Sequence, residues 1–366
     1  MEAPEVELRL RSVAPSDAPA LVALAGENLH SYWTEAFVLW KYFENPAGRI
    51  HGCCAEIEGQ IVGFYGNAPL RIKVGSEVIA GAQALDAMVT PAARRHGLFV
   101  KLGDWVHTRM AEAGVAVSYG IPNPVSRAGL VKRMGWDYPG EIPRYVRVLQ
   151  PTAVVEASGL KGVKALVYRL ALRAVQALHP SPRSLQVDSR VRIREVEAFD
   201  ARFDDLWAQV AGDFPIAVVR DCTYLMWRYA QNPLLRYTIL IAERDGVLCG
   251  YTILSHRDME EGVLAVAELV VVPGDASAGL ALLAAATAYA QKAGAAQVQC
   301  WMLPQYSFYA RLLERSGFIY GTSRFLPGLF RYTTSLIVKL PAGSALSPDP
   351  RHLVHWYMTM GDQDYY

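Results

Sequence analysis

Hydrophobic residues in the first 150 positions recur partly every second residue, as in strands, and partly every three or four residues, as in helices. The pattern predicts strands over 8–13, 53–57, 61–67, 82–90 and 115–120, and helices over 16–29, 32–44, 97–113 and 126–134. Asn45-Pro46 ends the second helix, because proline disfavours helix in the residue before it. This order of elements predicts a mixed α/β domain.

The same pattern returns in the second half of the chain. A Trp-[Lys/Arg]-Tyr-x-x-Asn-Pro unit begins at Trp40 and again at Trp227, 187 residues later. Further landmarks match at an offset of 182, among them Asp86/Glu268 and Gly97/Gly279. Rare residues that recur in the same order indicate a tandem duplication. We therefore expect related domains over 1–150 and 191–366, joined by a linker over 151–190.

Composition and charge narrow the possible functions. The chain of 366 residues is 52% hydrophobic and carries a net charge of +1, so it can bury full-sized cores and has no general attraction to nucleic acid. Its five cysteines show no metal-binding spacing. The first residues lack the apolar run of a signal peptide. We expect a cytoplasmic protein that binds no metal and no nucleic acid.

The clearest chemistry lies in the loop between the strand that ends near Thr90 and the helix that begins at Gly97. A loop of this kind points backbone N–H groups and the positive end of the helix dipole at one place. Gly97 allows a ligand to approach closely, and Arg94 and Arg95 add charge that suits a pyrophosphate. The alternative is a basic helix start without a ligand, which the strand–loop–helix order disfavours.

At this loop the sequence resembles the GNAT (GCN5-related N-acetyltransferase) superfamily. Arg94-Arg95-His96-Gly97-Leu98 matches its [QR]-x-x-G-x-[GA] motif, and Phe99 departs from the last position. The stretches 123–126 and 130–136 look like the closing motif of that family. The resemblance implies an α/β (α+β) protein of two tandem GNAT-like domains, each with a mixed, mostly antiparallel central sheet flanked by helices. It also implies acetyl-CoA, or another acyl-CoA, as cosubstrate.

The resemblance further implies which residues bind that cosubstrate. Met88 and Val89 would contact the pantetheine arm through their backbone, and Asn123 would lie beside the thiol end. The pyrophosphate would be bound by Arg94, Arg95, His96, Gly97, Leu98 and Phe99.

Acyl transfer to an amine needs a group that accepts a proton. Asp86 is the only carboxylate on the strand before the loop, and we interpret it as the general base; the alternative is a carboxylate that bonds a loop or pairs with an arginine. The family often places a tyrosine where this chain has Val131. Tyr119 is the nearest substitute as general acid, although most strand tyrosines are packing residues.

Other residues fit an ordinary structural role better. The Trp40 and Trp227 units occur in both copies, so we expect them to pack a helix against its sheet. His96 and His107 are interpreted as surface residues.

The second copy departs from the first in the loop itself. Its equivalent, 272–280, keeps Gly279 but replaces both arginines and introduces Asp275. A carboxylate beside a pyrophosphate is repulsive. We expect this copy to keep the fold without binding the cofactor, and to shape the acceptor cleft of the other copy.

The linker and the C-terminal end complete the chain. A helix over 160–178 places Lys161, Lys164, Arg169 and Arg173 on one half and Val163, Leu166, Val167, Leu170 and Ala174 on the other. We favour an amphipathic connector docked on a domain over a helix on a membrane surface. Residues 356–366, aromatic and acidic, are either a final strand or a tail that reaches the acceptor cleft.

Taken together, these features predict an N-acyltransferase that moves an acetyl or other acyl group from acyl-CoA to a primary amine of a small molecule or amino sugar. The chemistry would belong to the first domain. One alternative is a non-catalytic acyl-CoA-binding or scaffold protein. A further alternative is a ligase-like tandem GNAT protein that uses aminoacyl-tRNA, for which only the basic linker offers a binding surface.

Overall fold

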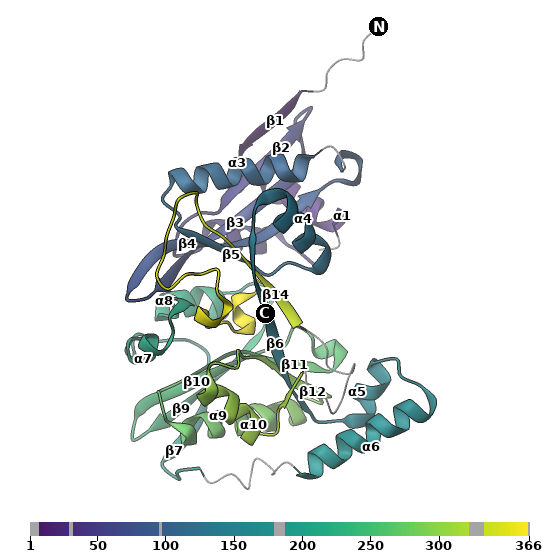
Figure 1. The fold of residues 1–366 in the computed structure, drawn as a ribbon, viewed down its shortest axis with the longest axis vertical. Helices are drawn as coiled ribbons and strands as arrows, with labels where there is room; N and C mark the ends of the chain where they lie inside the picture. The colour runs from purple at the N-terminus through teal and green to yellow at the C-terminus, as the bar shows by residue number, and fades with distance from the viewer. Residues whose placement is uncertain (1–6, 29–31, 95–96, 179–186, 322–332, 365–366) are drawn as a thin grey trace. The chain divides into compact units, whose positions relative to one another are not determined.

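The computed structural model describes residues 7–28, 32–94, 97–178, 187–321 and 333–364 (Figure 1). The chain forms two compact units. The first contains the residues up to Gly140 together with Gln231–Leu234 and Ser335–Leu353, and the second contains Glu141–Ala230, Leu235–Thr334 and the residues from Val354 onward.

The first unit is built on a mostly antiparallel sheet with the strand order β1-β2-β3-β4-β5-β14, in which β4 and β5 are the only parallel neighbours among the described residues. Its strands are β1 (Leu8–Ser12), β2 (His51–Ile57), β3 (Gln60–Val74), β4 (Glu77–Val89), β5 (Val117–Gly120) and the end of β14 (Thr333–Lys339). Its helices are α1 (Ala18–Glu27), α2 (Glu35–Phe43), α3 (Leu98–Glu112) and α4 (Pro124–Met134). The mixed α/β fold expected from the periodicity is confirmed.

Opposite faces of this sheet carry different helices. Cys53 of β2 lies in a core cluster with Leu102 and Val106 of α3, whereas the Cys54 thiol lies beside Asp17, just before α1. Neighbouring residues of a strand point to opposite faces. The face with α1 and α2 is therefore distinct from the face with α3 and α4.

Near the middle of the first sheet, β4 and β5 separate. Their pairing runs from Gly81–Val117 to Ala84–Gly120, whereas β4 continues to Val89 and there pairs with β3. A β-bulge opposite Gly66 shifts the alternation of β4, so that Asp86 faces α2. Beyond Ala84, the edge of β4 that faced β5 is no longer paired with it.

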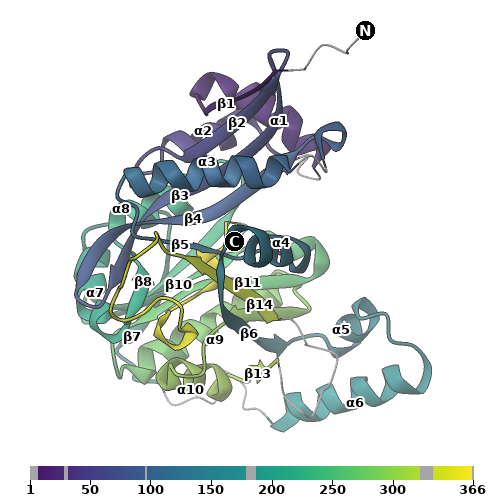
Figure 2. The ribbon, with the colours of Figure 1, turned by 45° about the horizontal axis from the view of Figure 1, so that its top comes forward.

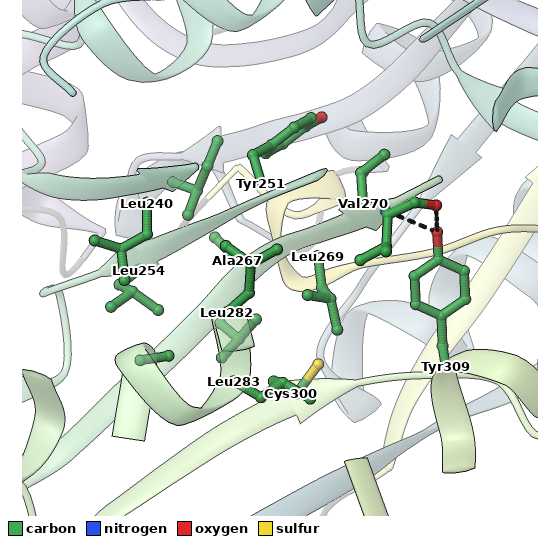
Figure 3. Packing of buried hydrophobic residues seen from close by; sticks show 14 of the residues in the cluster. Leu240, Tyr251, Leu254, Ala267, Leu269, Val270, Leu282, Leu283, Cys300 and Tyr309 are labelled. Atoms are coloured by element: carbon green, nitrogen blue, oxygen red, sulfur yellow. Dashed lines mark hydrogen bonds between the residues drawn. The ribbon is translucent and has the colours of Figure 1, made fainter. Parts of the chain in front are cut away.

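The second unit repeats this plan with the strand order β6-β12-β11-β10-β9-β7. The strands are β6 (Asp137–Val148), β7 (Val191–Val196), β9 (Tyr237–Arg244), β10 (Val247–Ser255), β11 (Val263–Val271) and β12 (Gln297–Trp301), and β13 (Ile319–Tyr320) pairs with β6. The unit also contains the short strand β8 (Ile216–Val218) and, among its helices, α7 (Arg202–Val210), α8 (Cys222–Leu225), α9 (Ala276–Lys292) and α10 (Ser307–Arg315). Figure 3 shows part of its core, where Leu269 of β11 lies on the same side as Leu282 and Leu283 of α9, and the Tyr309 hydroxyl hydrogen-bonds the backbone of Val271.

Each sheet is completed by a strand from the other half of the sequence. Residues 337–339 of β14, which lie in the range expected for the second copy, pair with β5 of the first unit. Residues 144–148 of β6, which lie in the range expected for the first copy, pair with β12 of the second unit. The compact units are therefore discontinuous in sequence, unlike the ranges 1–150, 151–190 and 191–366 expected for the duplication.

The linker region forms two helices of the second unit, α5 (Pro151–Ala157) and α6 (Gly162–Leu178) (Figure 2). The expected helix over 160–178 is confirmed. None of the helices in the described part of the chain is both long enough and apolar enough to cross a bilayer.

Candidate active site

A buried ion pair connects α2 to β4 in the first unit. Asp86 is 4% exposed, and its Oδ2 accepts a hydrogen bond from Lys41 Nζ at 2.7 Å and another from the Tyr42 hydroxyl at 2.6 Å. Within the described residues, both of these hydrogen bonds go to Oδ2 and none goes to Oδ1. One oxygen of Asp86 is thus held by two donors.

Aromatic rings surround the ammonium group of Lys41. Its Nζ lies 5.0 Å from the ring centroid of Trp33, 5.5 Å from that of Phe37 and 5.7 Å from that of Tyr42. Ring faces attract a cation, and this attraction adds to the pairing with Asp86. The two contributions offset the cost of burying a lysine that is only 5% exposed.

The Lys41–Asp86 pair lies close to the point where the pairing between β4 and β5 ends. Asp86 follows Ala84, the last residue of β4 paired with β5, by two positions. The register places Tyr119 beside Gln83, on the same face as Asp86. Tyr119 is fully buried between β4 and β14. Asp86 and Tyr119 therefore share one face of the sheet, at the point where the strands separate.

The loop after β4 leads to the N-terminus of α3, where an anion can approach the backbone N–H groups. Gly97 adopts a φ of +70° as the N-cap of α3, has no side chain to cap the first turn, and has open space where a Cβ would be. The guanidinium of Arg94 donates to the Val89 carbonyl and to Asn28 Oδ1, both at 3.1 Å. Arg95 and His96 lie outside the described residues.

The remaining expected cofactor residues fall into two groups. The side chains of Met88, Leu98 and Phe99 point into the protein. Met88 is 2% exposed, and Leu98 lies in the core cluster between α3 and the sheet. Phe99 is partly buried against this cluster, and its ring contacts the ring of Tyr65. These residues offer a ligand only their backbone groups. Asn123 is the N-cap of α4, where its side chain accepts a hydrogen bond from Ser126 N at 2.9 Å.

The second unit also contains a hydrogen-bonded pair of an acid and a tyrosine, and its C-terminal tail covers this pair. Tyr229, the counterpart of Tyr42, donates to Glu268 Oε1 at 2.9 Å, and Arg220 donates to Oε2 at 3.0 Å. Burial raises the pKa of the Glu268 carboxyl, and the Arg220 guanidinium opposes this shift. Asp362, from the C-terminal tail, pairs with the same Arg220 at 2.7 Å.

The tail occupies the place where β11 and β12 separate. Their pairing ends at Val266–Cys300, and beyond it the Tyr357 hydroxyl donates to the Leu269 carbonyl at 2.6 Å. Gly361 fits so closely that an added Cβ would clash with the Tyr229 hydroxyl and lie 2.7 Å from Glu268 Oε1. Of the two possibilities for this segment, it is a tail rather than a strand, and it fills the second unit.

The helix start of the second unit is also closed. Asp275 caps α9 by accepting from Ala278 N at 3.0 Å, and Arg244 pairs with its carboxylate at 2.7 and 2.9 Å. In the second copy, the residue that corresponds to Leu98, the first residue of α3, is Leu280. Helix α9 begins one turn before that residue, at Ala276. A carboxylate of the protein itself therefore stands where the first unit leaves an open N-terminus.

Sequence reasoning missed the role of Lys41 and Tyr42, which were expected only to pack a helix. The signal was present, because both copies keep a basic–tyrosine pair on the helix and an acid on the strand. His107 was wrongly taken for a surface residue. It is half-buried between the rings of Tyr65 and Trp136, and burial, with a smaller contribution from Lys339, lowers its pKa to about 4.

The described residues contain no group of His, Cys, Asp or Glu side chains arranged to hold a metal ion. Residues 9–138 match the family model of the acetyltransferase (GNAT) domain. No curated protein matches the sequence.

Solved structures share the fold at low sequence identity. A GCN5-related N-acetyltransferase from Kribbella flavida is 15% identical, with a TM-score of 0.61, over 93% of this chain and 72% of that chain. A tandem GNAT protein from the clavulanic acid biosynthesis pathway is 14% identical, with a TM-score of 0.52, over 93% of this chain and 100% of that chain. Saccharomyces cerevisiae N-myristoyltransferase, solved with myristoyl-CoA, is 10% identical, with a TM-score of 0.58, over 98% and 88% of the chains.

Proposed function

We propose that the protein is an acyl-CoA-dependent N-acyltransferase, because residues 9–138 match the family model of the acetyltransferase (GNAT) domain and the chain shares its fold with a tandem GNAT protein. It moves an acetyl group from acetyl-CoA, in the first unit, to a primary amine of a small molecule or amino sugar. The five cysteines are all free, in keeping with a reducing, cytoplasmic location.

One contrast carries this proposal. In the first unit, the helix start at Gly97 is open and has Arg94 beside it, whereas in the second unit Asp275 and Arg244 close the corresponding place. Open N–H groups and a helix dipole favour a pyrophosphate. The protein therefore binds one acyl-CoA per chain, on the backbone N–H groups of Leu98 and Phe99 and on Arg94.

The separated edges of β4 and β5 suit the rest of the cosubstrate. Val89 lies on the edge of β4 that is no longer paired with β5, and its backbone binds the pantetheine arm once Arg94 releases its carbonyl, with Met88 beside it on β4. The thioester supplies an activated carbonyl. Asn123 has its side chain engaged as the cap of α4, so it acts by positioning that helix.

Asp86 supplies the base in this mechanism. Lys41 and Tyr42 hold its Oδ2, and Oδ1 takes the proton that an attacking amine loses. Tyr119 lies on the same face of the sheet and is the candidate to protonate the leaving thiolate. Both groups lie at the end of the paired part of β4 and β5, beside the proposed path of the thioester.

Calorimetric titration with acetyl-CoA tests the cofactor site. We expect a single site on the wild type and at least a tenfold loss of affinity in Gly97→Glu, because a carboxylate there repels the pyrophosphate. Gly274→Glu is the matched control: Gly274 has a φ of +80° and open space around it, in the corresponding loop of the second unit. Both variants carry a similar backbone strain of about 1–2 kcal/mol, and only the first should lose binding.

Turnover then decides between an enzyme and a binding protein. The wild type is screened against amino sugars and small amines, with release of free CoA thiol as the readout. Release that depends on an amine supports the transferase. Tight binding of acetyl-CoA without turnover on any amine favours the non-catalytic alternative, and equal binding by the wild type and Gly97→Glu contradicts the proposed cofactor site.

A further inference from the structure

Helix α6 presents an apolar stripe to solvent. Val163 is 77% exposed, Leu166 52%, and Val167 and Leu170 55% each. These positions are three or four residues apart, so they lie along one side of the helix. Ala174 and Ala177, also exposed, continue the same side by one more turn. Four large apolar side chains are thus exposed next to one another, which is unusual for a solvated helix.

The side that docks is the opposite one. Ala165 is 5% exposed and Leu172 is fully buried, and both pack against Val146, Val148 and Val155 of the second unit. Gln176 Nε2 donates to the carbonyls of Val148 and Leu149, at 2.9 and 3.1 Å. The expectation that Val163, Leu166, Val167 and Leu170 form the docked half is therefore wrong: the helix docks through another face.

Cations border the stripe on both sides. At about 100° per residue, Lys164 lies about 100° to one side of Val163, and Arg173 lies about 80° to the other side, next to Arg169. Lys164 and Arg173 are exposed. The sequence has no Asp or Glu between Glu156 and Asp188. The exposed surface of α6 is thus apolar at its centre and only basic at its borders.

We propose that α6 is an interfacial helix that binds the surface of an anionic lipid bilayer. An apolar stripe flanked by Lys and Arg enters the boundary between headgroups and acyl chains, while the cations contact anionic headgroups. A second copy of the chain is a poor occupant, because it would bring basic borders against basic borders. The helix is already formed on its unit, so binding requires no folding.

Flotation with lipid vesicles tests the proposal on the full-length protein. We expect binding to vesicles that contain phosphatidylserine, weaker binding to vesicles of phosphatidylcholine alone, and a decrease as salt rises. Replacing Lys164 and Arg173 by Gln should weaken binding about fivefold per cation. The pair Leu166→Gln and Leu170→Gln should weaken it at least tenfold.

The matched control for the apolar pair is Val247→Gln. Val247, the first residue of β10, is 63% exposed, and the one cation opposite it, Arg244, is paired with Asp275, so its replacement should leave vesicle binding unchanged. Because all the substituted side chains are exposed, the melting temperature should stay within a few degrees. The lipid and salt series on the wild type need no variant and stand even if a variant fails to fold.

Three results would overturn the proposal. The wild type could fail to float with phosphatidylserine vesicles at low salt, or it could bind phosphatidylcholine alone equally well. The Leu166→Gln, Leu170→Gln pair could bind as the wild type does. Sedimentation without lipid identifies the rival occupant: self-association that this pair abolishes, in a protein that ignores vesicles, would assign the stripe to a second copy of the chain.

Discussion

At the scale of single residues, Asp86 combines two demands that usually conflict. A buried carboxylate needs a cation to compensate its charge, and a base needs an oxygen free to accept a proton. Here Lys41 and Tyr42 both contact Oδ2. The second unit instead surrounds Glu268 with Arg220, Tyr229 and the tail, which leaves no space for a substrate.

Asp86→Asn should lower kcat about 10²- to 10⁴-fold with little change in the KM for acetyl-CoA, because it removes the base and leaves the cofactor loop intact. The same change leaves Lys41 buried without its counter-charge, which costs about 3–5 kcal/mol of stability. The double variant Lys41→Met, Asp86→Asn should regain stability but not activity. Steady-state kinetics and thermal melts separate the two effects, and recovery of kcat in the double variant would disprove a role as base.

His107 makes the stability of the protein depend on pH. Its pKa is about 4 in the folded protein and near 6.5 in an unfolded chain, so between these values the unfolded state binds more protons. The contribution of His107 is fully present above pH 6.5 and is lost as pH falls toward 4. His107→Gln should therefore show a shallower fall of melting temperature than the wild type between pH 6.5 and 4. Parallel curves would show that His107 does not titrate in this range.

At the scale of elements, local pattern predicted most helices and strands but not their partners. The helix predicted over 97–113 matches α3 closely, whereas the strand predicted over 82–90 matches only the second part of β4, which begins at Glu77. Nothing local in β14 shows that it pairs with β5. The error on α6 has a similar cause: apolar residues occur on two sides of this helix, and periodicity cannot tell which side the sheet covers.

The candidate site was predictable only in part for the same reason. The loop at Gly97 is contiguous in sequence, so its motif could be read directly. The partners of Asp86 lie 44 and 45 residues before it, on another element. Comparing the two copies could have linked them, because each copy keeps an acid on the strand and a tyrosine on the helix.

The C-terminal tail behaves as a structural part of the second unit, and Gly361 is its closest contact. Gly361→Ala should destabilise that unit by about 1–3 kcal/mol, because the new methyl group overlaps the Tyr229 hydroxyl in a packed interior. Gly212→Ala, with open space around it in the same unit, is the control and should change stability by less than about 1 kcal/mol. Denaturant unfolding measures both, and equal stability of the two variants would mean that the tail shifts freely.

At the scale of the whole molecule, the two halves of the sequence depend on each other. The first sheet needs residues 335–339, where Leu336, Ile337 and Val338 are all fully buried. A fragment of residues 1–150 would leave the edge of β5 unpaired and the apolar face of that strand open to water. We therefore expect the fragment alone to aggregate or to lack a cooperative thermal transition, because an exposed apolar edge strand invites association.

Adding back the missing strand tests whether that pairing, rather than fragment length, decides folding. Co-expression of 1–150 with 191–366 should yield a soluble complex with a cooperative melt, because the second fragment carries β14. In that second fragment, Ile337→Asp should abolish the rescue by placing a charge in the core, whereas Val247→Asp, at the exposed start of β10, should not. If fragment 1–150 alone melts cooperatively as a monomer, the first unit folds without β14, and the duplicated halves are independent domains despite the exchanged strands.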